Sequence, residues 1–169
     1  MSLELEVVVL DSAWRKQLPR AKSRLTKALT HALSEMPAAI SKRSISLAVA
    51  LSDDARVKQL NHQFRGKNKP TNVLSFSPYS DDELKAALRS RKAMPLELGD
   101  IVLARETVER EARAQDKSFA DHATHLTVHG LLHLLGHDHE TDSEAEDMEA
   151  LEIAILAKLG IDNPYQLPN

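Results

Sequence analysis

A histidine-rich stretch, HGLLHLLGHDH at residues 129–139, decides how the rest of the chain is interpreted. On an α-helix, His129 and His133 stand one turn apart on one face, with their side chains leaning the same way. Their ring nitrogens can therefore converge on a single metal ion. Gly136 follows where a glycine in the left-handed conformation would end the helix. Because such a turn reverses the chain, it can bring back His139, and the sequence predicts a three-histidine metal site.

Three imidazoles without a thiolate suit a catalytic zinc ion that keeps water in its fourth position, although these ligands do not separate zinc from nickel. The chain has no cysteine, which excludes disulfides, thiolate zinc sites and a cysteine nucleophile. His125 lies one turn earlier and is interpreted as a residue behind the ligands or facing substrate. His122 and His137 are interpreted as solvated or peripheral. The alternative is a histidine-rich surface helix, or core histidines satisfied by hydrogen bonds.

The segments around this helix predict one α+β domain over residues 1–169, with strands early and helices late. Apolar alternation and short apolar runs predict strands at 3–10, 44–50, 73–76 and 98–104. Helical spacing predicts helices at 12–36, 53–64, 105–116, 119–135 and 143–159. Residues 77–97 are polar and are predicted to form a mobile loop that can hold one helical turn. The expected architecture is a small mixed sheet packed against helices, one of which binds the metal.

The net charge of −3 conceals two halves of opposite sign. Residues 1–92 carry 17 Lys and Arg against 9 Asp and Glu, or +8, whereas residues 93–169 carry 5 against 16, or −11. A basic half suggests a polyanionic partner, and the alternative is two solvated faces of opposite charge. The sequence shows neither a signal peptide nor an apolar run long enough to span a membrane, so we expect a cytoplasmic protein.

A basic loop with Arg65, Lys67 and Lys69 precedes the strand predicted at 73–76. The planar guanidinium of arginine matches phosphate oxygens and can stabilise charge on a phosphorane-like transition state. Simple solvation of the loop is the alternative interpretation. We expect Trp14 and Phe64 in the core, which leaves few aromatic side chains to stack on nucleic-acid bases.

The histidine spacing is similar to that of the metzincin proteases, HExxHxxGxxH, with one departure. Their glutamate is the general base that acts on zinc-bound water, and this chain has Gly130 in its place. A zinc peptidase therefore stays an alternative that Gly130 weakens. Zinc alone lowers the pKa of water towards 7, so hydrolysis stays open. We expect zinc hydroxide itself to be the base, with Asp138 or Glu140 as weaker candidates.

Four segments together resemble the YbeY family of bacterial rRNA maturation factors: LNHQFRG at 60–66, PTNVLSF at 70–76, GDI at 99–101 and the histidine stretch. The resemblance implies a zinc-dependent endoribonuclease that acts on single-stranded RNA, in small-subunit rRNA 3′-end maturation and ribosome quality control. It implies one zinc ion held by His129, His133 and His139, and a functionally important arginine at Arg65. Ribosomal RNA, the small ribosomal subunit and ribosome-associated proteins are the implied partners.

The chain departs from this family at two points. Asn72 stands where the family usually has aspartate, and the segment 77–97 is longer and more charged than expected. A third alternative is a non-catalytic ribosome assembly factor whose zinc is structural. A fourth protein ligand such as His125, with no exchangeable water, would favour that alternative.

Overall fold

The computed structural model describes residues 2–90, 94–138 and 140–166. A mixed sheet with strand order β1-β2-β4-β3 lies at its centre. The strands β1 (Ser2–Val9), β2 (Ser44–Ser52) and β4 (Leu96–Ala104) are parallel, and the short β3 (Val73–Phe76) runs antiparallel to β4. The four predicted strands and the α+β class are confirmed.

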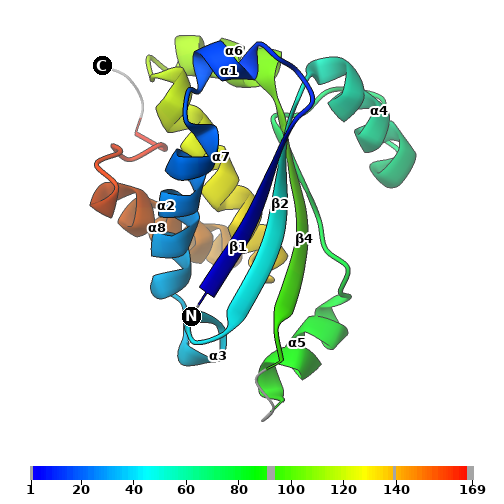
Figure 1. Ribbon diagram of the computed structural model, residues 1–169, viewed down its shortest axis with the longest axis vertical. Helices are drawn as coiled ribbons and strands as arrows, with labels where there is room; N and C mark the ends of the chain where they lie inside the picture. The colour runs from blue at the N-terminus through cyan, green and yellow to red at the C-terminus, as the bar shows by residue number, and fades with distance from the viewer. Residues whose placement is uncertain (1, 91–93, 139, 167–169) are drawn as a thin grey trace.

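Helices α2 and α7 pack against one face of the sheet, whereas α4 covers one end of the other (Figure 1). None of the helices in the described ranges has the length and apolar character needed to cross a membrane. The helix bounds are α1 Trp14–Gln17, α2 Ala21–Ser34, α3 Ala38–Ser41, α4 Asp54–Arg65, α5 Asp81–Arg89, α6 Arg105–Ala114, α7 Phe119–Leu134 and α8 Asp142–Lys158.

The histidine helix α7 is also a core helix. Its Leu131 and Leu132 are fully buried, and the helix contacts α2, α6, α8, β3 and β4. A helix packed on so many sides has little freedom to shift or rotate, because close-packed interiors resist changes of volume. The histidines of the predicted metal site therefore project from one of the most constrained elements of the molecule.

The helix predicted at 12–36 is divided in two. Leu18 ends α1 with φ −134° and ψ 71°, and Arg20 precedes α2 with a left-handed φ of 58°. The physical reason is Pro19, because the residue before a proline is driven away from helical dihedral angles. Trp14 is fully buried as predicted, and its Nε1 donates to the Ser52 carbonyl over 2.7 Å.

The prediction of a mobile loop at 77–97 is wrong for residues 81–89, which form the nine-residue helix α5. Ser80 and Glu83 make a capping box at its start, and Leu84 buries its apolar side. At its end, the buried Arg43 donates to the backbone carbonyls at positions 87, 88 and 90, over 2.9, 3.4 and 3.4 Å. The density of charge in this segment hid a short amphipathic helix.

The prediction that Phe64 lies in the core is also wrong, because 61% of its surface is exposed. Phe64 occupies the last turn of α4 and meets the ring of Phe76 edge-on at a centroid distance of 5.4 Å. Hydrophobic character alone does not fix burial, since the last turn of a helix can project past the layer that it covers.

Candidate metal centre

The helix α7 ends as its sequence predicts. Gly136 has a left-handed φ of 94°, its N–H donates to the His133 carbonyl, and the N–H of His137 donates to the Leu132 carbonyl. These two bonds form a Schellman motif, which reverses the chain immediately after the histidines. His139, the predicted third ligand, lies outside the described residues.

His129 and His133 approach each other through the ring atoms expected to bind metal. Their Nε2 atoms are 3.1 Å apart, and the ring planes are inclined by 79°. A tetrahedral ion with metal–nitrogen bonds of 2.0–2.1 Å separates its ligand atoms by about 3.3 Å. The spacing of the two imidazoles therefore fits a shared zinc ion.

Behind this pair lies Glu152 of α8, whose carboxylate is fully buried. Its Oε1 is 2.6 Å from Nδ1 of His129, and its Oε2 is 2.8 Å from Nε2 of His125 and 2.5 Å from the hydroxyl of Tyr165. His125, His129 and Glu152 form a group that could hold a metal ion, with ligand atoms within 4.8 Å of one another. A buried carboxylate thus joins two histidines of the predicted site.

The electrostatics of this group follow from its hydrogen bonds. Burial by itself raises the pKa of Glu152, but the bonds with His125 and His129 outweigh it and lower that pKa to about 2. Burial lowers the pKa of His125, with hydrogen bonding to Glu152 opposing it. Burial and the Glu152 carboxylate raise the pKa of Tyr165. The group is therefore ionised at its centre, with a neutral tyrosine bonded to it.

A second carboxylate corrects the interpretation of His122 as solvated or peripheral. His122 is 3% exposed, and its Nε2 lies 2.9 Å from Oε1 of Glu111 on α6. Asn72, where the family usually has aspartate, donates to the same oxygen over 2.9 Å. Burial raises the pKa of Glu111, but the bonds with His122 and Asn72 lower it overall. Asn72 thus serves here as a hydrogen-bond donor to a carboxylate.

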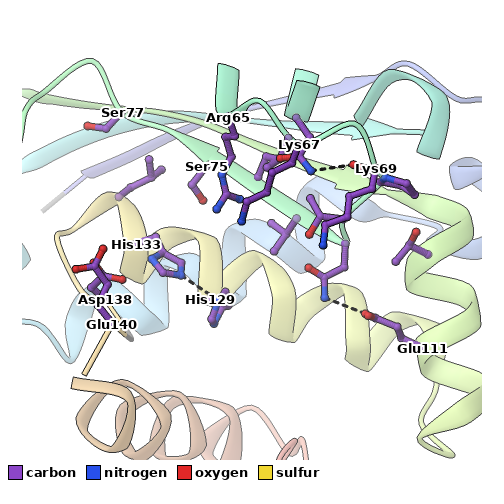
Figure 2. A pocket seen from close by; sticks show the side chains of 18 residues that line it. Arg65, Lys67, Lys69, Ser75, Ser77, Glu111, His129, His133, Asp138 and Glu140 are labelled. Carbon is purple, nitrogen blue, oxygen red and sulfur yellow. Dashed lines mark hydrogen bonds between the residues drawn. The ribbon is translucent and has the colours of Figure 1, made fainter. Parts of the chain in front are cut away.

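A cleft of about 900 Å³ opens in front of His129 and His133. Arg65, Lys67 and Lys69 lie along its other side, so the basic loop and the histidines face the same space (Figure 2). Within the described ranges, no ion pair involves any of these three cations. The loop charges stay available to an anion in the cleft.

The remaining predicted residues fall on different sides of this cleft. Asp138 and Glu140 lie beside His133 at one end of it (Figure 2). His125 lines a neighbouring pocket with Tyr165 and Lys117, and His137 is half-buried just beyond the end of α7. The structure therefore brings Arg65, His129, His133 and Asp138 to one cleft and places His125 behind it.

Gly130, which replaces the protease glutamate, sits where a side chain would crowd its neighbours. A Cβ atom there would come within 2.9 Å of Ile101 Cγ2 and 3.0 Å of Ser75 Oγ. The Ser75 hydroxyl also donates to the Gly130 carbonyl over 3.1 Å. A side chain at this position would therefore require Ile101 or Ser75 to move.

The sequence analysis assigns no role to Glu152 or Tyr165, although the sequence of α8 contains a signal for Glu152. The buried positions of α8 are 148, 152, 155 and 156, an apolar stripe interrupted by one carboxylate. A charge on the apolar face of a helix needs a buried partner, and the histidines of α7 are the obvious donors. Tyr165 leaves no comparable signal, because it lies in an irregular segment.

Comparisons with known proteins agree with one another. A model of the family described as endoribonuclease YbeY matches residues 10–160. A relative of that name from Paramagnetospirillum magneticum is 44% identical over 167 residues, which cover 98% of this chain and 97% of the relative. Another from Azorhizobium caulinodans is 46% identical over 166 residues, covering 98% of both. The solution structure of a Thermotoga maritima protein shares the fold, with a TM-score of 0.52 at 22% identity over 93% of this chain and 92% of that one.

Proposed function

The chain belongs to the YbeY family of endoribonucleases, and from that premise we propose that it cleaves single-stranded RNA with a zinc ion held by His129, His133 and His139. The observation that carries this proposal is the placement of two imidazole Nε2 atoms, 3.1 Å apart, on a cleft whose other side carries three cations. Imidazoles favour zinc, and the cations favour a phosphodiester.

The metal would supply a Lewis acid for a phosphoryl oxygen and would lower the pKa of water. The residues of the chain would do the rest. Arg65 would hold the scissile phosphate through its planar fork of N–H donors. Lys67 and Lys69 would attract the neighbouring backbone with little regard for sequence. Asp138 or Glu140, at the end of the cleft, would accept a proton.

The two alternative functions are less well supported. A metzincin-type peptidase needs a carboxylate base after its first histidine, and this chain has Gly130 there, where even a Cβ atom would crowd Ile101 and Ser75. A structural zinc site would be closed by four protein ligands. His125, the candidate for a fourth, is hydrogen-bonded through Nε2 to Glu152 and does not line the cleft.

The RNA that we propose as substrate is the 3′ region of small-subunit ribosomal RNA, reached in the cytoplasm on the small subunit or with ribosome-associated proteins. Mapping that 3′ end in cells that lack the chain tests this. Wild type should restore the mature end and Arg65→Ala should not. Full restoration by Arg65→Ala would support a non-catalytic role in assembly.

Purified chain loaded with zinc and incubated with single-stranded RNA tests the chemistry. We expect cleavage by wild type, none by His133→Ala, and a large loss for Arg65→Ala. The matched control is Lys85→Ala, which removes an exposed cation from α5, away from the cleft. Cleavage that survives His133→Ala and Arg65→Ala equally would reveal a contaminating nuclease. A 2′,3′-cyclic phosphate on the product would identify the ribose hydroxyl as the attacking group.

A further inference from the structure

We propose that Glu152 is the positioning residue of the metal centre, and that Tyr165 locks it from the segment that follows α8. The inference rests on the proposed function, because it takes His129 to be a ligand. It concerns how the ligand is oriented and not which residues touch the metal.

The burial of the Glu152 carboxylate requires compensating hydrogen bonds and a nearby positive charge. Its side chain is fully buried, and among the described residues its ion-pair partners are His125 and His129, with no lysine or arginine. An ionised carboxylate removed from water costs several kcal/mol unless hydrogen bonds and a positive charge compensate it. A cation on the far side of the His129 ring would provide the positive charge.

The hydrogen bond from His129 to Glu152 determines which ring nitrogen of His129 carries the proton. An ionised carboxylate only accepts, so Nδ1 of His129 at 2.6 Å must donate its proton to Oε1. The lone pair of this neutral ring is then on Nε2, the atom 3.1 Å from Nε2 of His133. Carboxylates behind metal-binding histidines select the tautomer and strengthen the ligand in this way.

Glu152 itself is poorly placed to be a ligand. Its Oε1 is engaged by His129, and its Oε2 accepts from both His125 and Tyr165. It is also absent from the residues that line the cleft in front of His129 and His133. Its geometry suits orientation of the ring from behind.

Tyr165 completes the arrangement from a distant part of the chain. Its hydroxyl donates to Oε2 of Glu152 over 2.5 Å, and its ring packs edge-on against His125 at a centroid distance of 5.6 Å. The amine of Lys117 donates to the carbonyl of the preceding residue, Pro164, over 2.7 Å. The segment is therefore held at Pro164 and at the Tyr165 ring, next to the bond that holds Glu152.

The test measures zinc affinity by competition with a chromophoric chelator. Glu152→Gln should weaken binding by about 10–100-fold, the usual effect of losing a partner behind a ligand. Tyr165→Phe removes one hydroxyl from a partly exposed residue, preserves folding, and should weaken binding by about fivefold. Glu146→Gln, an exposed change on the same helix, is the control and should leave the affinity unchanged.

Nitrogen NMR of the His129 ring supplies a readout that a merely structural role would not move. Metal-free wild type should show the tautomer protonated on Nδ1, and Glu152→Gln should show a mixture with the same circular dichroism. Unchanged affinity and an unchanged tautomer in Glu152→Gln would overturn the inference and leave the proposed function standing. So would a cobalt spectrum of wild type that contains a carboxylate ligand lost in Glu152→Gln. Wild type that takes up no zinc would overturn the proposed function as well.

Discussion

The two sides of the cleft are built on opposite principles. The imidazole side, His129 and His133 on α7, rests on a core helix, with the buried Glu152 bonded behind His129. The cationic side, Arg65, Lys67 and Lys69, consists of exposed side chains at the end of α4 and in the loop after it. The imidazole rings are fixed by interior hydrogen bonds, whereas the three cationic side chains reach into solvent from the end of α4 and from a loop that the Asn61 side chain holds at the Lys69 carbonyl.

The two sides are therefore suited to different tasks, which are precise placement of the imidazole rings on one side and attraction of phosphate groups on the other. Buried hydrogen bonds are insensitive to salt and hold a ring to within a fraction of an ångström, as an ion requires. Exposed cations attract any nearby phosphate, and added salt weakens them. Changes on the imidazole side should therefore alter stability and metal content, whereas changes on the cationic side should alter only RNA binding and turnover.

The largest effect on stability is expected from Glu152→Ala. Its removal leaves three buried or half-buried donors, on His125, His129 and Tyr165, without their acceptor. We expect a loss of about 3–5 kcal/mol in the free energy of unfolding. Urea unfolding of the metal-free chain measures it, with Glu146→Ala as the control. A loss below about 1 kcal/mol would mean that the imidazole side is not held from within.

Arg65→Ala should have the opposite effect, lowering the cleavage rate and leaving the free energy of unfolding nearly unchanged. We expect the cleavage rate to fall by about 10²–10³-fold, as for removal of one donor to a charged transition state. The unfolding free energy should change by less than about 0.5 kcal/mol, since Arg65 is exposed and unpaired among the described residues. Zinc content should equal that of wild type. An Arg65→Ala chain that loses zinc would break the separation between the two sides.

Gly130→Ala tests the close contact between α7, which carries the imidazole side, and the sheet. Alanine favours a helix over glycine by about 1 kcal/mol, but overpacking against the buried Ile101 costs about 1–3 kcal/mol. The expected net result is a destabilisation of about 1 kcal/mol with reduced cleavage. Thermal unfolding measures the sign, and a stabilised chain would show that the helix can retreat from the sheet.

Replacing Lys67 and Lys69 together with alanine should reduce the salt dependence of RNA binding on the cationic side. If each contacts one phosphate of single-stranded RNA, the slope of log K against log salt should become shallower by about 1.4. Fluorescence anisotropy across a salt series, with Lys85→Ala as the control, measures this slope. An unchanged slope would remove both lysines from the RNA path.

The smallest expected effect is a loss of stability at acidic pH, caused by protonation of Glu111. The folded-state pKa of Glu111 lies below its usual 4.5 because the hydrogen bonds from His122 and Asn72 outweigh burial. Its contribution to stability is therefore present above about pH 4.5 and is lost as the pH falls through the lowered pKa. Because Glu111 is a third exposed, we expect less than about 1 kcal/mol. The free energy of unfolding is measured for wild type and Glu111→Gln between pH 3 and pH 7. Parallel curves of this free energy against pH would contradict the expectation.

The sequence could predict the features of the site that depend on the spacing of residues within one helix. The approach of His129 to His133 follows from the helical repeat, and the end of α7 follows from Gly136. The link from His129 to Glu152 joins two helices, and no spacing rule reaches across them. Glu152 was hidden among the acidic residues of α8, although its place on the buried stripe set it apart.

The differences between sequence prediction and structure share one cause: the polarity of a residue does not by itself determine its exposure to solvent. His122 is polar yet buried, since Glu111 satisfies it, and Phe64 is apolar yet exposed at the end of its helix. Residues 81–89 are rich in charge yet form a helix, because Ser80 caps its start and Arg43 its end. In each case a partner distant in sequence, or the position along an element, decided the outcome.

Arg43 also connects the central sheet, through α5, to the turn that follows α7. Its guanidinium ties the end of α5 to the start of β2, and Leu84 of α5 lies close to Gly136 in the turn after α7. The conformational entropy of that turn is lost during folding and not at the moment of capture. Under the proposed function, a turn ordered in this way would select among ions by their radius and preferred geometry.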